Sequence, residues 1–301
     1  MSRIRSWYNQ NRRIIWVIIL IIAGAIGLIQ SLNAYYKNES KDKSSSTNSG
    51  TTAYNKNNQA VISGKKIDDD VAKKSNNTID NFINYCNSGK IDQAYSILST
   101  ECKEELYPTV EDFKNKYIDR IFTEEKSYDS VLWISTKTKN TYRIEIMKDL
   151  LANGEREYMP IEEYYTLLKE NGKYKLNING YIGKENIDKK KRVNDIEVNI
   201  ISKKTYLEYE TYEISVKNNT GDTLIFNRKN NTDATYIQDK NNLKYIALIN
   251  EIPSNLFSIP NGIERKYTIK FNREYNPNIE IKKIVFGDIG FGNLTNIEVD
   301  L

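Results

Sequence analysis

Residues 14–29 form an apolar run, IIWVIILIIAGAIGLI, that contains no charged side chain. Together with the uncharged residues that follow as far as Tyr36, the segment is long enough to cross the hydrocarbon layer as a helix, at about 1.5 Å per residue. A helix is required there because lipid cannot satisfy free backbone groups. The sequence therefore predicts a cytoplasmic tail at residues 1–13 and a transmembrane helix at residues 14–36, acting as a signal-anchor.

The orientation of this segment follows from its flanking charges. Arg12 and Arg13 directly precede the apolar run, and the positive-inside rule places them in the cytoplasm. The expected location is the cell membrane, with one pass and with the bulk of the chain extracytoplasmic. A cleaved signal peptide is the alternative, with a cleavage site after Ala34, although Leu32 is bulky for the position three residues before the cut.

Composition limits the chemistry that the chain can perform. The 301 residues include no histidine and only two cysteines, which excludes histidine-based acid–base catalysis, cysteine–histidine arrangements and cysteine-cluster metal sites. We therefore expect no enzymatic activity, no catalytic or metal-binding residues and no cofactor. The 44 Lys and Arg fall to 40 without the four arginines that precede the apolar run, which equals the 40 Asp and Glu. A neutral remainder argues against a nucleic-acid partner.

After the apolar segment the composition changes twice. Residues 37–70 are rich in Ser, Thr, Asn and Lys and predict a flexible linker. A helical period follows, in which Ile79, Phe82, Ile83 and Cys86 share one face, and Ser88-Gly89 ends that helix. Strand-like alternation begins near residue 130. Helices followed by an antiparallel sheet predict an α+β domain over residues 71–185.

Two short motifs in this region carry a resemblance. The stretch from Gly89 to Leu98, GKIDQAYSIL, resembles the second helix of nuclear-transport-factor-2-like domains, and Asn171 to Leu176, NGKYKL, is similar to their last hairpin. Asn-Gly between two strand-like runs is also a strong hairpin signal in its own right. The resemblance implies a cone-shaped roll, in which a curved sheet wraps around a long helix.

The C-terminal third lacks a helical period and contains about seven short strand candidates separated by turn signals. This pattern predicts an all-β sandwich over residues 193–301. The stretch from Tyr212 to Gly221 resembles the second strand and turn of bacterial immunoglobulin-like (Ig-like) domains. The basic run Lys189–Arg192 marks the expected boundary as a solvated hinge, and a lipid- or nucleic-acid-binding patch is the alternative.

Few residues are candidates for a functional site. If the α+β domain is a cone, its aromatic residues line a pocket for a small apolar ligand or for a partner's side chain, or else fill the core; these residues are Tyr95, Phe113, Trp133 and Tyr165. Glu162 and Glu163 are adjacent in a strand and so point to opposite faces, which prevents both from entering one pocket. An extracytoplasmic location permits a disulfide between Cys86 and Cys102, and two buried thiols are the alternative.

These expectations combine into two hypotheses of function. The first is a membrane-anchored extracytoplasmic interaction or scaffold protein whose partners are other envelope proteins. An anchor, a linker and a nuclear-transport-factor-2-like domain resemble the layout of scaffold subunits in conjugation and type IV secretion systems, which implies membership of such an apparatus. The second is an envelope ligand-binding or sensory protein that uses the aromatic residues of its α+β domain.

Overall fold

A computed structural model describes residues 58–148, 160–226, 233–290 and 295–301. Within these ranges no helix is long and apolar enough to cross a membrane. The expected transmembrane helix at residues 14–36 lies outside them, as do Arg12, Arg13 and residues 37–57. The described residues therefore do not support the prediction of a membrane-spanning protein. They show instead a chain built mostly of β-sheet.

The first helix, α2 (Asp69–Asn87), presents the apolar face that its sequence predicts, with Ile79, Phe82, Ile83 and Cys86 all buried. Gly89 follows at a φ of 64°, a left-handed conformation that glycine adopts without strain, and the helix ends before it. Ser99 and Thr109 cap later helices by accepting hydrogen bonds from the backbone N–H groups of Cys102 and Asp112. The remaining helical segments are α3 (Ile91–Ile97), α4 (Thr100–Leu106), α5 (Val110–Phe113), the π-helical turn η1 (Lys114–Ile118) and α6 (Asp119–Ile121).

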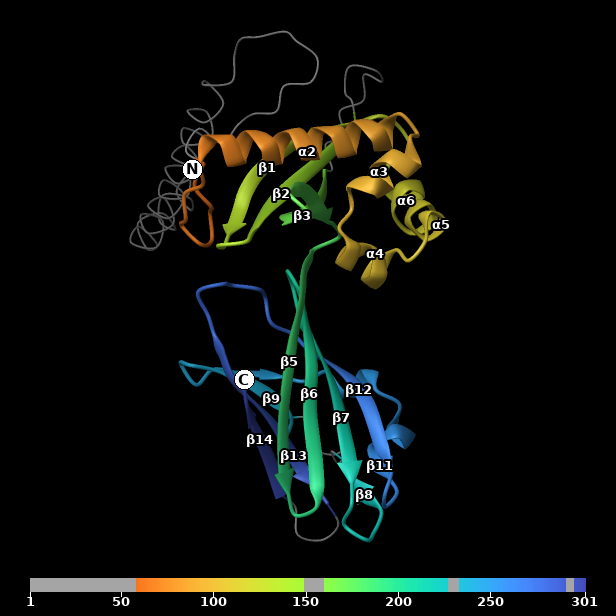
Figure 1. Ribbon diagram of the computed structural model, residues 1–301, viewed down its shortest axis with the longest axis vertical. Coiled ribbons are helices and arrows are strands. Elements are labelled where there is room, and N and C mark those ends of the chain that lie inside the picture. The colour runs from red at the N-terminus through yellow and green to blue at the C-terminus, as the bar shows by residue number, and fades with distance from the viewer. Residues whose placement is uncertain (1–57, 149–159, 227–232, 291–294) are drawn as a thin grey trace, which may run out of the picture. The chain divides into compact units, whose positions relative to one another are not determined.

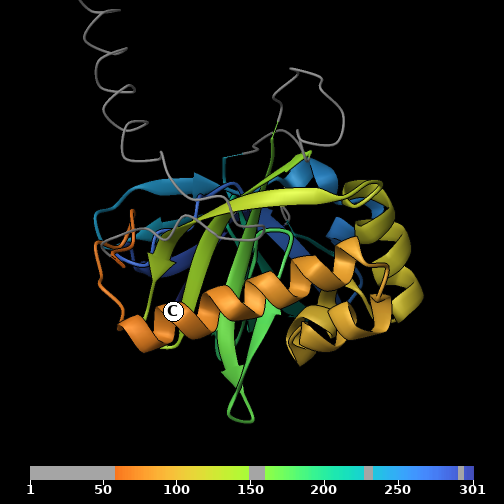
Figure 2. The same ribbon diagram turned by 90° about the horizontal axis from the view of Figure 1, so that it is seen from above.

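The helices pack against an antiparallel sheet whose four strands follow one another in sequence order. Figure 1 and Figure 2 show α2 crossing this sheet. Inward-facing residues of the strands and the buried helix faces share one core, which includes Phe82, Tyr117 and Tyr165. The strands are β1 (Lys126–Ser135), β2 (Lys139–Lys148), β3 (Ile161–Glu170) and β4 (Lys173–Asn177).

The segment before α2 is ordered along the edge of this sheet. The backbone N–H groups of Val61 and Ile62 donate to the carbonyls of Leu132 and Trp133, and Ala60 is buried. Part of the linker expected over residues 37–70 is therefore held against the sheet, because Val61 and Ile62 hydrogen-bond to β1.

The second half of the described chain contains two four-stranded sheets and one two-stranded sheet around a common apolar core. The first four-stranded sheet has the order β12-β7-β6-β5, and the other has the order β10-β9-β13-β14; β8 pairs with β11. The bounds are β5 (Tyr181–Val193), β6 (Ile196–Tyr206), β7 (Glu210–Asn218), β8 (Leu224–Ile225), β9 (Tyr236–Asp239), β10 (Lys244–Ile246), β11 (Ser258–Ile259), β12 (Glu264–Phe271), β13 (Ile281–Ile289) and β14 (Thr295–Asp300), with the 3-10 turns η2 (Ile249–Glu251) and η3 (Ser254–Phe257).

The expected fold class is wrong. No nuclear-transport-factor-2-like cone is evident in the described residues: strands dominate, and the first sheet is a simple meander. The second part departs from an Ig-like sandwich beginning at residue 193, because its first sheet already includes β5 from Tyr181 onward. The short motifs that suggested both families specify a helix end, a hairpin and a turn, and these local features do not fix how strands assemble.

The basic run Lys189–Arg192 is not a hinge. All four residues belong to β5 and pair in register with β6, where Lys189 lies opposite Ile200 and Arg192 lies opposite Glu197. An exposed strand at the edge of a sheet needs no apolar alternation, so its sequence reads like a solvated loop.

Candidate functional site

Trp133 lies on the outer face of the first sheet, at a β-bulge of β1. The register between β1 and β2 shifts between Leu132 and Ile134, which leaves Trp133 as the extra residue. Bulges redirect a side chain and are common beside functional sites. The guanidinium of Arg143 on β2 lies over the indole at 5.0 Å from the ring centroid, and the ring of Tyr164 on β3 lies 6.2 Å from the indole at 60°.

Charged groups surround these rings. A terminal nitrogen of Arg143 lies 3.0 Å from a carboxylate oxygen of Glu145, and the Tyr164 hydroxyl donates to Glu162 at 2.5 Å. Burial, and then the Glu162 carboxylate, raise the pKa of Tyr164. The Nε of Arg143 is buried and has no hydrogen-bond partner within the part of the chain that the structure describes. We call Trp133, Arg143, Tyr164, Glu145 and Glu162 the Trp133 surface.

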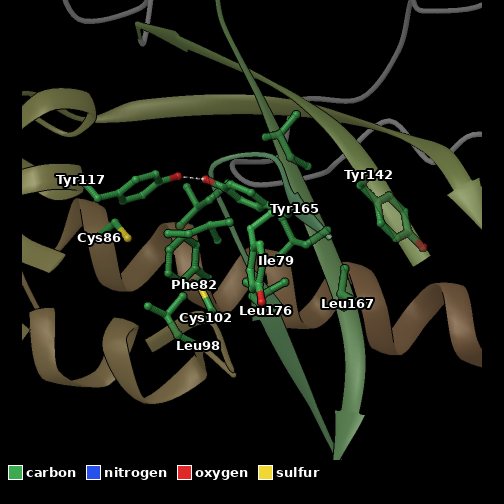
Figure 3. Packing of buried hydrophobic residues seen from close by; sticks show 14 of the residues in the cluster. Ile79, Phe82, Cys86, Leu98, Cys102, Tyr117, Tyr142, Tyr165, Leu167 and Leu176 are labelled. Carbon is green, nitrogen blue, oxygen red and sulfur yellow. Dashed lines mark hydrogen bonds between the residues drawn. The ribbon is translucent and has the colours of Figure 1, made fainter. Parts of the chain in front are cut away.

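The candidate aromatic residues separate into two groups. Tyr95, Phe113 and Tyr165 belong to one aromatic cluster around Phe82, whose ring lies 6.2 Å from Phe113 and 5.5 Å from Tyr165. Figure 3 shows Phe82 beside Tyr165. Tyr95 and Phe113 lie 5.8 Å apart. Phe82, Phe113 and Tyr165 have no exposed surface, so they fill the core of the first part. Trp133 is on the opposite face of the sheet and does not join them.

Two tyrosine hydroxyl groups of the buried cluster meet each other. The hydroxyls of Tyr117 and Tyr165 share a hydrogen bond of 2.6 Å, which Figure 3 marks with a dashed line. Burial is the main cause that raises the pKa of both hydroxyls well above the usual range, and the charge of Glu163 adds to it. Burial also raises the pKa of Glu163 to about 7, although backbone N–H groups and Arg120 oppose the change.

Glu162 and Glu163 lie on opposite faces of β3, as the two-residue period of a strand requires. Glu162 is exposed and belongs to the Trp133 surface, whereas Glu163 approaches the tyrosines of the core. Sequence reasoning did not single out Arg143 or Tyr164. The strand register identifies both residues, because Val131 pairs with Arg143 and Arg143 pairs with Tyr164, which places them side by side on one face of the sheet.

The two cysteines are free thiols, and both are buried. Burial raises the pKa of Cys102 to about 12 and raises that of Cys86 further above its ordinary value. Neither thiol therefore has the low pKa or the exposure of a reactive cysteine.

The described residues also define a small cavity between α2 and the sheet. Its volume is about 10 Å³, room for about one water molecule, and it is lined by Asn58, Ile67, Ala72, Asn76, Ser130, Leu132 and Tyr142. It is too small for an organic ligand. Within the described ranges no group of three or more Cys, Asp and Glu residues could hold a metal ion.

No protein-family model matches the sequence, and no curated protein matches it either.

Proposed function

We propose that this protein is a non-enzymatic interaction protein of the cell envelope and that the Trp133 surface is its main contact with a partner. The observation that carries the proposal is the contact of Trp133 with Arg143 and Tyr164 on the outer face of the first sheet, where all three side chains are half-buried. Tryptophan, tyrosine and arginine are the residues that most often dominate binding energy at protein interfaces.

The charges of the Trp133 surface favour a protein partner over a small apolar molecule. Arg143 keeps an unpartnered buried Nε, and the two glutamates offer acceptors at the rim of the rings. An apolar anchor surrounded by hydrogen-bonding groups is the usual composition of a protein interface. The extracytoplasmic location of this interaction is part of the proposal, and the charge asymmetry around the N-terminal apolar run supports it.

A non-enzymatic role also fits the chemistry of the chain. The sequence offers no histidine as a general base, and among the described residues the carboxylate with a pKa near 7, Glu163, lies among tyrosines of the core. An envelope assembly such as a conjugation or type IV secretion channel is the first setting in which we propose to look for the partner.

Site-specific photo-crosslinking in living cells tests this proposal. A benzophenone amino acid at Val131, which is half-buried beside Arg143, should give one adduct of defined mass in the full-length protein. The adduct should disappear when Trp133→Ala is added, while the melting temperature shows that the variant folds. The matched control is the same probe at Lys73, an exposed position on α2. Equal adducts at both positions, or an adduct that survives Trp133→Ala, would contradict the proposal.

A ligand-binding or sensory role is the second candidate, and Glu163 favours it. A carboxyl with a pKa near 7 changes charge within the ordinary pH range, and it lies close enough to Tyr117 and Tyr165 to alter their pKa values. If the protein has this role, a small molecule should raise the melting temperature of the wild-type chain. The size of this increase should depend on pH, and Glu163→Gln should remove that dependence. A ligand whose effect is unchanged in Glu163→Gln would argue against this cluster.

A further inference from the structure

Three polar side chains meet where the chain passes from β4 to β5. Glu101 lies on α4, Lys139 begins β2, and Asn177 ends β4. One carboxylate oxygen of Glu101 accepts hydrogen bonds from the Lys139 ammonium at 3.1 Å and from the Asn177 carboxamide nitrogen at 2.7 Å. The carbonyl of Ile182 accepts from the same two nitrogens, at 2.9 and 3.1 Å. Two shared acceptors therefore hold the lysine amine beside the carboxamide.

The backbone next to this carboxamide leaves room for an amine. Gly183 follows Ile182 at a φ of 151°, and a Cβ atom at Gly183 would lie 1.8 Å from the Lys139 nitrogen. The side chains of Lys139 and Glu101 are each 25% exposed, whereas Asn177 is fully buried. Burial keeps water away from the carboxamide, which disfavours its hydrolysis relative to attack by the neighbouring amine.

The carboxamide of Asn177 is polarised by its neighbours. Its oxygen accepts a hydrogen bond from the Ser99 hydroxyl, and its nitrogen donates to Glu101 and to the carbonyl of Ile182. A donor on the oxygen stabilises the negative charge that develops there when a nucleophile adds to the carboxamide carbon. A carboxylate that contacts both the attacking and the departing nitrogen can transfer protons between them. The cluster thus contains the groups that amide transfer requires.

A purely structural role explains only part of this arrangement. The carboxamide oxygen and both of its N–H groups already have partners in Ser99, Glu101 and Ile182, so the carboxamide does not need the lysine. An ion pair between partly exposed side chains contributes about 0–1 kcal/mol and needs neither shared acceptors nor a glycine beside it. The close approach of an amine to a buried carboxamide is the feature that a structural ion pair leaves unexplained.

We propose that Lys139 and Asn177 form an intramolecular isopeptide bond, with Glu101 as the group that transfers protons. Glu101 takes a proton from the Lys139 ammonium, and the free amine adds to Cγ of Asn177. That proton and a second proton from Nζ pass through Glu101 to Nδ2. The Cγ–Nδ2 bond then breaks and the nitrogen leaves as ammonium. The Glu101 carboxylate is regenerated, so the reaction needs no other reactant.

The bond joins two strands that are not neighbours, because β3 lies between β2 and β4. It closes the chain from Lys139 to Asn177 into a covalent loop. Closing such a loop restricts the unfolded chain and so favours the folded state. The bond is independent of the Trp133 surface, since it acts on the chain itself and involves no partner.

The mass of the intact full-length protein, purified in detergent, tests the proposal. It should be lower than the sequence mass by one molecule of ammonia, and proteolysis should yield one branched peptide that joins Lys139 to Asn177. Lys139→Met and Glu101→Gln should each restore the sequence mass. The matched control is Lys175→Met, which removes a lysine whose amine donates to the carbonyl of Ser96, and it should retain the loss of ammonia. Circular dichroism should show that all three variants fold.

A further variant changes the leaving group. Asn177→Asp should lose one molecule of water in place of ammonia, because amide formation from a carboxylic acid releases water. Succinimide formation at Asn171-Gly172 also releases ammonia, but hydroxylamine opens a succinimide and leaves an isopeptide bond intact. Three results would overturn the proposal: a wild-type chain with the full sequence mass, a loss of ammonia that survives Lys139→Met, or a loss that hydroxylamine removes.

Discussion

Arg273 and Glu210 form an ion pair in which only 3% and 1% of the two side chains are exposed. The second carboxylate oxygen of Glu210 accepts a hydrogen bond from the Tyr212 hydroxyl at 3.1 Å, and Arg273 also donates to the carbonyl of Ile279 at 2.8 Å. Glu210 begins β7 and Arg273 follows β12, so the pair links the ends of two neighbouring strands. The ion pair is therefore part of a hydrogen-bond network, because the Glu210 carboxylate also accepts from Tyr212 and the Arg273 guanidinium also donates to Ile279.

Removing one member of this pair should be strongly destabilising. Arg273→Met leaves the Glu210 carboxylate buried without its cation, and we expect a loss of about 3–5 kcal/mol in the free energy of unfolding. The double variant Glu210→Leu/Arg273→Met should lose less than the two single changes combined. Urea unfolding measures both. The exposed pair of Lys240 and Glu280 supplies the control, where Lys240→Met should change stability by no more than about 0.5 kcal/mol.

Glu163 should make stability depend on pH. Its pKa is about 7 in the folded protein against an ordinary value of 4.5, so between these values the folded state holds more protons than the unfolded state. Stability should therefore fall as pH rises from about 4.5 to 7, by roughly 3 kcal/mol, and then level off. Urea unfolding at pH 5 and pH 8 should show this fall in the wild-type chain, and Glu163→Gln should abolish it. Equal pH dependence in the two proteins would show that other groups cause it.

The two thiols should be unreactive until the protein unfolds. Cys86 is 3% exposed and Cys102 is fully buried, and burial raises the pKa of both, so the native protein contains neither an accessible sulfur nor an appreciable thiolate fraction. Iodoacetamide at pH 8 should label neither cysteine in the folded chain. In urea without a reducing agent it should label both, and mass spectrometry gives the number of labels per chain. A pair that stays unlabelled in urea until a reductant is added would instead be a disulfide.

Local elements could be predicted where side-chain pattern and backbone chemistry agree. The face of α2 follows from the spacing of Ile79, Phe82 and Ile83, which are all buried. The hairpin between β3 and β4 follows from Asn171-Gly172, whose φ angles of 51° and 76° are the left-handed values that such a two-residue turn requires.

Longer-range features could not be predicted. Residues 131–134, VLWI, are apolar at consecutive positions, so alternation does not show which face Trp133 takes. The bulge at that point also changes the register. Most of β5 is charged and exposed at an edge, and it carries no two-residue apolar period. The assembly of β5 with β6 is set by backbone pairing, for which the one-dimensional sequence holds no direct signal.

Asn218 is another buried polar residue on which the stability of the second part should depend. It is fully buried at the end of β7, and its side-chain nitrogen donates to the carbonyls of Asp222 and Ile259 at 2.7 and 2.8 Å. Its side-chain oxygen accepts from the backbone N–H of Thr220 at 3.0 Å and from the Thr220 hydroxyl at 2.8 Å. One amide thus holds the turn after β7 against β11.

Replacing Asn218 should show how much its side-chain amide contributes to the free energy of unfolding. Asn218→Ala leaves the carbonyls of Asp222 and Ile259 without this donor, and we expect a loss of about 2–4 kcal/mol in the free energy of unfolding, measured with urea. Asn218→Asp should recover little, because a carboxylate can accept from Thr220 but cannot donate to either carbonyl. The neighbouring Asn219 is exposed, so Asn219→Ala should change stability by no more than about 0.5 kcal/mol. If the two alanine variants unfold at the same urea concentration, the buried amide does not hold this turn.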